Sequence, residues 1–358
     1  KNPRIKKIKK IALTAATALF SLAACGGTSK EAACNAATSY GDVEKTLNLS
    51  GFNGFTASWP VAINYTQGQT YKVVARGSEE AFSMTNISVI GGKLSVKRKK
   101  DSYQSDADKH TITLYVTAPA VNSIQNNARM DFTAQSLKTG GLSITNNGML
   151  TFKADAVAGG GSSSAFDVSN NGRMDIAVPS VKAGTMTISN NGVLMFGDGT
   201  VSSDILKMTN HGRMDFSCSV KGGSADFNNS GVGMIKGAFT LEGDYKYANY
   251  GRSDIDGDVT ARGISIYNSG VDMRKSRLKA DNLSVEVSGR SDYDMSFTGG
   301  KAELACSGVG MFNLSLDCQS VTASASGRIE VTLSGTADNT EFTGSGVSHI
   351  KTSELNKF

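Results

Sequence analysis

The chain has 358 residues, of which 40 are glycine and only 7% are aromatic, a composition that suits a turn-rich β protein better than a helical one. Its net charge of +5 is concentrated at the start. Residues 1–24 contain six Lys and Arg and no acid, which leaves 31 basic residues (37 − 6) and 32 acidic residues in the remainder. A nearly neutral chain lacks the electrostatic footprint of a protein that binds nucleic acid or an anionic membrane surface.

Residues 1–24 have the pattern of a secretion signal. A basic segment precedes an apolar stretch, Ile11 to Ala24, that is too short to span a bilayer. It ends in Leu-Ala-Ala before Cys25, which resembles a bacterial lipobox and implies a membrane anchor on a diacylated Cys25, held stably by several acyl chains. An ordinary signal peptide or an uncut anchor is the alternative. Gly26 implies sorting to the outer membrane, and the orientation toward the periplasm or the cell surface stays open.

The pattern divides the chain into four regions: a signal peptide (1–24), a flexible tether of small polar residues (25–41), an N-terminal β cap with the first irregular coils (42–125), and regular repeats (126–358). Alternation and β-branched residues in the third region predict strands at 61–65, 71–75, 93–96 and 111–116, a turn at 91–92, and a charged hairpin loop over 97–109. A repeat array needs capped ends, so we expect this region to cap the array.

From residue 126 a unit of 19 or 20 residues recurs twelve times, except that the second copy is longer and should form a loop at 159–164. One column of small residues marks the copies: Ala128, Gly148, Gly172, Gly192, Gly212, Gly231, Gly251, Gly270, Gly289, Gly308, Gly327 and Gly346. Such a period indicates one supersecondary unit stacked on itself.

Side chains of a strand point alternately to its two faces, so the parity of a position, odd or even along each copy, predicts which side chains face the core. The residue four after the glycine is apolar in every copy but one, so it should point inward together with the residue two after. Asn precedes the glycine by two positions in eight successive copies, where a turn with positive φ and a ladder of stacked amides are expected. These features predict a single-stranded parallel β-helix of about twelve coils, with coils ~4.8 Å apart and a rod ~58 Å long.

The strands before residue 125, followed by serial Ser/Asn-Gly-Arg-x-Asp and Ser-Gly-Val-x-Met turns, resemble the family described as putative auto-transporter adhesin, head GIN domain. The resemblance covers about residues 45–350. It implies an all-β fold with a right-handed β-helix, of the kind found in lipoproteins of Bacteroidetes. The chain departs from the family pattern in having Arg where small residues are usual and in its strict alternation of Arg and Val copies. The family has no established activity, so no catalytic residue is transferred.

The residues one and three after the glycine should face outward and form a surface stripe. They alternate between Arg-x-Asp and Val-x-Met in the eight middle copies: Arg173, Asp175, Val193, Met195, Arg213, Asp215, Val232, Met234, Arg252, Asp254, Val271, Met273, Arg290, Asp292, Val309 and Met311. One interpretation is solvated charge pairs that prevent edge-to-edge association, and it is the stronger of the two. The other is a recognition surface, which exposed Val and Met would favour.

Two other groups of residues are candidates for chemistry, and a third lies in the eighth copy. Asp254, Asp256 and Asp258 alternate as in a calcium site, but opposite charges on neighbouring coils favour an ion-pair ladder of Lys236, Asp256, Lys275 and Asp294, with Asp258 beside Arg277. Cys306 and Cys318 are the plausible internal disulfide pair, and free thiols are the alternative. No metal site and no cofactor is predicted.

The eighth copy breaks the core rule, because Asp272 and Arg274 occupy the inward positions. Either the local parity flips and turns Val271 and Met273 inward, or a polar pair is buried. The flip is favoured because a buried pair incurs a large desolvation penalty. These two residues are the candidate irregular site.

Three functions remain open. The first is a non-enzymatic, lipid-anchored envelope protein whose repetitive surface acts as an adhesin or binds a glycan, lipid or protein partner. The second is a β-helix that binds or cleaves polysaccharide, for which Asp272 and Arg274 are the only irregular cluster. The third is a binder of apolar or lipid ligands through the Val and Met rows. The sequence leaves the oligomeric state open.

Overall fold

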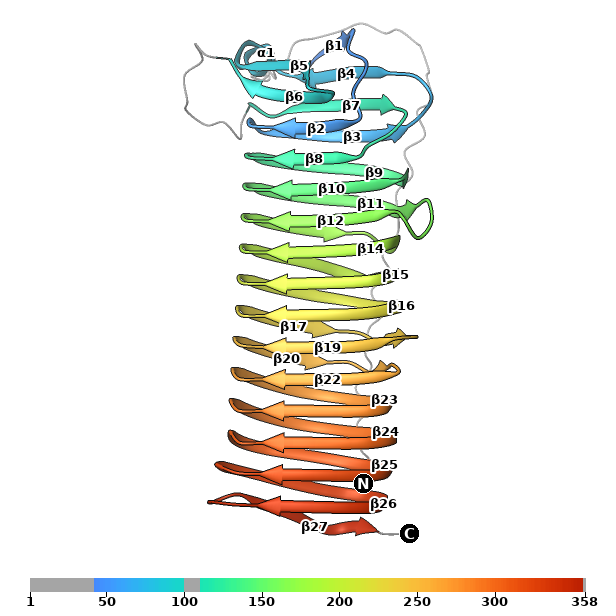
Figure 1. The fold of residues 1–358 in the computed structure, drawn as a ribbon. Coiled ribbons are helices and arrows are strands. Elements are labelled where there is room, and N and C mark those ends of the chain that lie inside the picture. The colour runs from blue at the N-terminus through green and yellow to red at the C-terminus, as the bar shows by residue number, and fades with distance from the viewer. Residues whose placement is uncertain (1–41, 100–109, 357–358) are drawn as a thin grey trace, which may run out of the picture. The chain divides into compact units, whose positions relative to one another are not determined.

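The computed structural model describes residues 42–99 and 110–356, which belong to one compact unit (Figure 1). The predicted signal peptide, the tether, Cys25 and positions 100–109 of the predicted charged loop lie outside the described residues. The helix is α1 (Glu79–Met84), and the strands are β1 (Val43–Leu47), β2 (Gly54–Ala57), β3 (Val61–Gln67), β4 (Lys72–Gly77), β5 (Thr85–Ile90), β6 (Lys93–Arg98), β7 (Ile112–Ala118), β8 (Ser123–Asn126), β9 (Arg129–Thr139), β10 (Gly141–Asn146), β11 (Met149–Gly159), β12 (Ala165–Asn170), β13 (Arg173–Ala177), β14 (Ser180–Asn190), β15 (Val193–Asn210), β16 (Arg213–Asn229), β17 (Val232–Lys236), β18 (Phe239–Leu241), β19 (Asp244–Asn249), β20 (Arg252–Asp256), β21 (Val259–Thr260), β22 (Gly263–Asn268), β23 (Val271–Val287), β24 (Arg290–Cys306), β25 (Val309–Ala325), β26 (Arg328–Gly344) and β27 (His349–Asn356).

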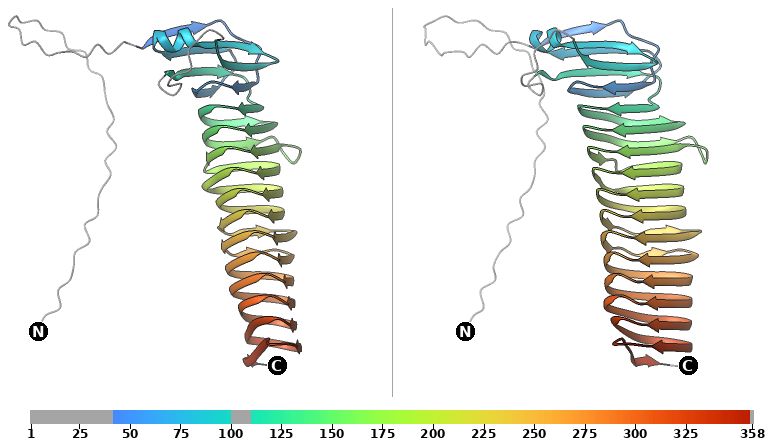
Figure 2. Two further views of the ribbon diagram at one scale, coloured as in Figure 1. Left: turned by 90° about the vertical axis from the view of Figure 1, so that its left-hand side faces the viewer. Right: turned by 60° about the vertical axis from the view of Figure 1, so that its left-hand side comes forward.

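Each coil of the solenoid has three sides. One coil shows them as separate strands: β17 forms the first face, β18 the second and β19 the third. Each strand pairs in parallel with its counterpart one coil away, as β17 does with β20 and β19 with β22. The third-face strands cross the front of Figure 1 from right to left while the chain descends, so the coil is right-handed. The predicted parallel β-helix is therefore confirmed, and Figure 2 shows its coils in one stack.

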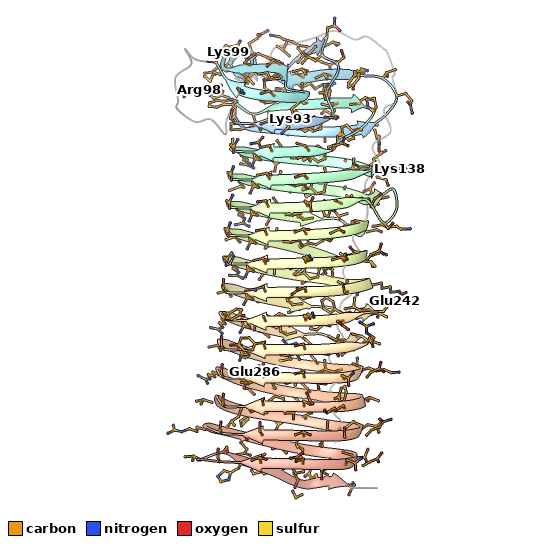
Figure 3. The ribbon with its side chains drawn as sticks, viewed as in Figure 1. Lys93, Arg98, Lys99, Lys138, Glu242 and Glu286 are labelled. Carbon is orange, nitrogen blue, oxygen red and sulfur yellow. The ribbon has the colours of Figure 1, made fainter. Side chains whose placement is uncertain are left out.

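The side chains that form the core are those that the parity of their positions predicted to point inward. The residues two and four after the turn glycine are buried in nearly every coil, as with Met130 and Phe132, which are both 0% exposed. Aromatic rings stack from coil to coil where they meet, for example Phe132 on Phe152 with centroids 5.4 Å apart and planes at 8°. Longer side chains at the edge opposite the Asn turns, such as Lys138 and Glu242, project outward (Figure 3).

The predicted Asn ladder runs without interruption from Asn126 to Asn268. The Nδ2 of each Asn donates to the Oδ1 of the next at 2.7–2.8 Å, through Asn126, Asn146, Asn170, Asn190, Asn210, Asn229, Asn249 and Asn268. Each of the eight amides also donates to a backbone carbonyl of the following coil, as Asn190 does to Arg213 at 2.8 Å. A second, exposed ladder on the neighbouring column joins Asn127, Asn147, Asn171 and Asn191, and the sequence analysis did not anticipate it.

The glycine column serves a different purpose from the one predicted. Of its glycines, only Gly327 and Gly346 have a positive φ. The others are required by the close approach of neighbouring coils, because a Cβ on Gly212 would lie 2.0 Å from the carbonyl oxygen of Gly192. Corresponding contacts of 1.9–2.1 Å recur from Gly148 to Gly308. The expectation of positive φ was wrong for most of the column, since the coil spacing itself excludes a side chain.

Residues 42–125 close the N-terminal edge of the stack. β2 and β3 pair in parallel with β8 and β9 and so form a coil of their own, and β6 and β7 pair in parallel with β2 and β3. Antiparallel strands then end the array: β5 on β6, and β4 on β7. An open edge is a template for aggregation, and these strands cover it. The expected strands are all present, whereas α1, with Ser78 as its N-cap, was not predicted.

Cys218, Cys306 and Cys318 are free and buried, so Cys306 and Cys318 do not form a disulfide. Burial raises the pKa of Cys218 and of Cys306 to about 12. Because the thiolate is the reactive form, a chain with Cys25→Ser and Cys34→Ser should react negligibly with a disulfide reagent at pH 8 until it is unfolded. Thiol release measured with and without denaturant checks this, and rapid release from the folded chain would contradict it.

Candidate functional site

The structure brings all sixteen predicted stripe residues onto the first face in two adjacent columns. One column stacks the Arg and Val positions, as Arg173 on Val193 and Val193 on Arg213, and the other stacks the Asp and Met positions. The same register continues to Val309 and Met311. Twelve of the sixteen side chains are exposed, and Asp175, Asp215, Met234 and Met273 are half-buried. The outward prediction is therefore confirmed.

The stripe is longer than the sequence analysis proposed. Its register extends toward the N-terminus through Met149 and Thr151 to Arg129 and Asp131. It extends toward the C-terminus to Arg328 and Glu330. We use the term binding stripe for these eleven coils, from Arg129 to Glu330. This extension could have been predicted from the sequence, because the copies at both ends keep the Arg-x-acid pattern.

The apolar coils of the binding stripe stay open to solvent. Thirteen large hydrophobic side chains are exposed among the described residues, and seven of them lie on this one face: Met149, Val193, Met195, Val232, Val271, Val309 and Met311. Exposed apolar residues scattered singly need no explanation, whereas larger exposed apolar patches are typical of interaction surfaces.

Three of the six charged coils form an ion pair along the strand. The Arg and Asp of one coil lie 3.7 Å apart at Arg129–Asp131, 3.6 Å at Arg173–Asp175 and 3.3 Å at Arg213–Asp215. One carboxylate oxygen of Asp175 and one of Asp215 are buried without a hydrogen-bond partner among the described residues. Alternation with Val doubles the spacing of like charges from ~4.8 Å to ~9.6 Å along the solenoid. The stripe thus presents neutral charge pairs separated by apolar steps.

The predicted ion-pair ladder beside the stripe forms only in part. Asp258 and Arg277 make a two-pronged contact, with Nε of Arg277 3.0 and 3.1 Å from the two carboxylate oxygens. This hydrogen bonding lowers the pKa of Asp258 and raises that of Arg277. Lys236, Asp256, Lys275 and Asp294 are neighbours in the register, but no two of them approach within ion-pair distance. Exposed lysines gain little from such pairing and stay solvated.

Asp272 and Arg274 are buried at 0% and 3% exposure, and Val271 faces outward, so the predicted parity flip was wrong. The carboxylate of Asp272 accepts hydrogen bonds from Ser253 Oγ at 2.5 Å and from the Tyr293 hydroxyl at 2.6 Å. Nη2 of Arg274 lies 3.3 Å from Asp272 Oδ2. The guanidinium also packs over the ring of Tyr247, 4.8 Å from its centroid.

The surroundings of this pair keep Arg274 charged and exclude solvent from both side chains. Burial opposes the charge of Arg274, but Asp272 and the nearby tyrosines outweigh it and raise its pKa. Burial also raises the pKa of Tyr245, Tyr247 and Tyr293, so these hydroxyls stay protonated. The side chains of Asp272 and Arg274 have no solvent exposure. The only irregular cluster that the sequence suggested as a site is therefore inaccessible to a polymer.

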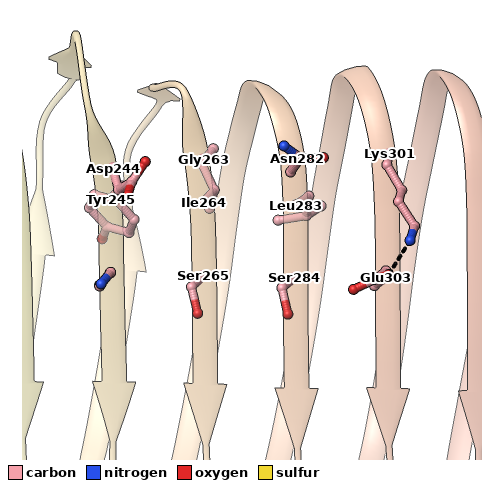
Figure 4. Close-up of a pocket in the computed structure, with 11 residues that line it drawn as sticks. Asp244, Tyr245, Gly263, Ile264, Ser265, Asn282, Leu283, Ser284, Lys301 and Glu303 are labelled. Atoms are coloured by element: carbon pink, nitrogen blue, oxygen red, sulfur yellow. Dashed lines mark ion pairs between the residues drawn. The ribbon is translucent and has the colours of Figure 1, made fainter.

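A depression of about 310 Å³ lies elsewhere, on the third face across β19, β22, β23 and β24 (Figure 4). Gly263, Ser265 and Ser284 form its shallow middle, and the Lys301–Glu303 ion pair bounds one end. It could not be predicted from the sequence, because a hollow made by small residues between longer ones has no motif. It is open and lacks an exposed aromatic ring among its lining residues.

None of the helices in residues 42–99 and 110–356 is long and apolar enough to cross a membrane. In the same ranges, no three His, Cys, Asp or Glu side chains are placed to hold a metal ion.

Solved structures resemble this chain at low identity. They include a "putative adhesin" from Bacteroides fragilis NCTC 9343, with 14% identity, 87% of this chain and 97% of that chain covered, and a TM-score of 0.25. Another, from Parabacteroides distasonis ATCC 8503, has 13% identity, coverage of 85% and 98%, and a TM-score of 0.31. A "putative lipid binding protein" from the same strain has 10% identity, coverage of 88% and 97%, and a TM-score of 0.26. No residue role can be transferred at these values.

No curated protein sequence matches the chain at a significant level. A family model described as "Putative auto-transporter adhesin, head GIN domain" matches residues 51–299 and 294–357. These ranges include most of the cap and the whole regular array. With its parallel solenoid, antiparallel cap and serial glycine turns, the chain belongs to the head GIN domain family.

Proposed function

We propose that this protein is a non-enzymatic, adhesin-like protein of the cell envelope, anchored through a diacylated Cys25, and that the binding stripe is its contact surface. The observation that carries the proposal is that, of the thirteen large hydrophobic side chains exposed in residues 42–99 and 110–356, seven lie on one face. A surface that repeats over eleven coils suits attachment to an extended partner better than chemistry at one point.

The two alternatives from the sequence have less support. Cleavage of a polysaccharide needs reactive groups that reach the substrate, and the side chains of Asp272 and Arg274 have no solvent exposure. Binding of a lipid chain needs a continuous apolar path, but the Val and Met coils alternate with charged ones at every step. An acyl chain lying along the stripe would remove guanidinium and carboxylate groups from water, which is costly.

The test uses the double variant Met234→Lys and Met273→Lys, which places charge on two apolar coils of the binding stripe. Beads carrying the full chain should retain a mucin-type glycoprotein, and the double variant should retain at least about tenfold less, a loss of about 1.4 kcal/mol in binding free energy. The matched control is Ser265→Lys with Ser284→Lys, which adds the same charge at exposed positions of the third face and should bind as the wild type does.

Other outcomes would contradict the proposal. Equal loss in both variants would mean that charge alone, and not the stripe, governs retention. Unsaturated products from polygalacturonate would establish an enzyme, and capture of phosphatidylcholine vesicles without glycoprotein binding would favour the lipid alternative. Protease resistance on intact cells, with cleavage after lysis, would place the protein in the periplasm and count against adhesion.

A further inference from the structure

The two columns of the binding stripe are complementary to each other in every coil. In odd coils the first column carries a long cation, Arg, and the second an acid, which is Asp except for Glu330. In even coils the first carries the short Val and the second the long Met, except in the coil of Met149 and Thr151. Arg and Asp attract, Val and Met are both apolar, and long side chains match short ones. The two columns could therefore interdigitate if they were brought face to face.

One symmetry operation achieves this arrangement. A twofold axis parallel to the solenoid axis, placed between the columns, turns the stripe over and exchanges its columns while each coil keeps its height. Arg213 of one copy then faces Asp215 of the other, and Val232 faces Met234. An axis perpendicular to the solenoid would instead bring like columns together, so that Arg would face Arg or Val.

We propose that the binding stripe pairs with the stripe of a second copy of this chain, side by side and in the same direction. The inference rests on the proposed function, in which the stripe is the contact surface. It names a second copy of this chain as an occupant, with which a glycoprotein would compete. A twofold contact of this kind is isologous, the commonest form of protein self-association. Two copies that run in the same direction are compatible with attachment to one membrane through Cys25.

The size of the stripe is sufficient for a stable pair. A strand of five residues is about 17 Å long and eleven coils rise about 50 Å, which gives on the order of 850 Å² per copy. Specific interfaces bury about 800 Å² per partner. Charges at the centre of an interface are costly unless they are paired. Arg173 and Arg213 pair with the Asp of their own strand, and in the proposed dimer each Arg of the eight middle copies faces an Asp of the partner.

Charge reversal tests the pairing directly. The acidic variant carries Arg213→Asp, Arg252→Asp and Arg290→Asp, and the basic variant carries Asp215→Arg, Asp254→Arg and Asp292→Arg. In sedimentation velocity of the full chain from about 1 to 100 µM, a range that spans moderate affinities, the wild type should be dimeric and each variant alone monomeric. An equimolar mixture of the two variants should restore the dimer, because both columns then face opposite charges.

The controls separate this inference from the proposed function. A chain with all six substitutions is self-complementary and should dimerise as the wild type does, which also shows that the substitutions preserve folding. A monomeric wild type, self-association of the acidic variant, or a mixture that stays monomeric would overturn the pairing. If the pairing is overturned, loss of glycoprotein retention in the variant Met234→Lys with Met273→Lys would still support adhesion. If the wild type dimerises but this variant retains glycoprotein as the wild type does, only the adhesion proposal is overturned.

Discussion

Replacement of Asp272 by Ala is expected to destabilise the fold by about 3–5 kcal/mol, because it leaves the guanidinium of Arg274 buried without its counter-charge. Asp272 is 0% exposed and is also the acceptor for Ser253 and Tyr293, so three groups lose their partner at once. The shift of the denaturant midpoint measures the loss, and amide hydrogen exchange in the coils around residue 272 locates it.

A double replacement distinguishes the missing charge from the missing volume. Asp272→Leu with Arg274→Ile restores the residue types that other copies have at these positions, and it removes both charges together. We expect it to recover at least half of the loss, since apolar substitutes for a buried pair are often neutral or stabilising. Equal destabilisation by the single and double variants would show that the ion pair is not what holds the eighth coil. Arg252→Ala with Asp254→Ala, on the surface of the preceding coil, should cost less than about 1 kcal/mol.

The substitution Gly212→Ala should destabilise the solenoid by about 3 kcal/mol or more, at the upper end of the cost of overpacking. Its Cβ would lie 2.0 Å from the carbonyl oxygen of Gly192 and 2.7 Å from the carbonyl carbon of Asn191. Both are backbone atoms, and the Gly192 oxygen already accepts the amide of Arg213 at 2.8 Å. The coils would have to separate, so local exchange protection should fall along with the thermal midpoint.

Gly140 provides the matched control for this experiment. A Cβ at Gly140 meets nothing within 4 Å, and its φ is not positive. Gly140→Ala should therefore be neutral or stabilise by about 0.4–1 kcal/mol through the unfolded chain. If both substitutions had the same effect, the steric role of the glycine column would be refuted.

Much of the fold could be predicted from the repeat, because local patterns decide it. Parity placed Met130 and Phe132 in the core, and the Asn column indicated the amide ladder. The second ladder was also visible in the sequence, because Asn126 is followed by Asn127 and the next three copies repeat this dipeptide. The prediction considered only the first Asn of each dipeptide. The cap was less predictable, since α1 has six residues and depends on one N-cap at Ser78 and on tertiary contacts.

The error at the eighth copy has a specific physical cause. The prediction weighed the desolvation of Asp272 and Arg274, but it did not weigh the cost of shifting one strand inside a stack. β23 is held by β20 on one side and β24 on the other, and the Asn249–Asn268 bond of 2.8 Å fixes the preceding turn. A one-residue slip would disrupt these bonds on both sides. Burial of the polar pair, hydrogen-bonded to Ser253 and Tyr293, is the smaller cost.

The alternation of the binding stripe also limits how the length of this protein can change. Deleting or duplicating one coil would place Arg directly beside Arg at ~4.8 Å, or would join two apolar coils, whereas a change of two coils preserves the sequence of neighbours. Homologues that keep the stripe should therefore differ in length by pairs of repeats, in steps of ~9.6 Å along the axis. The evolutionary unit of this solenoid is then two coils, although its folding unit is one.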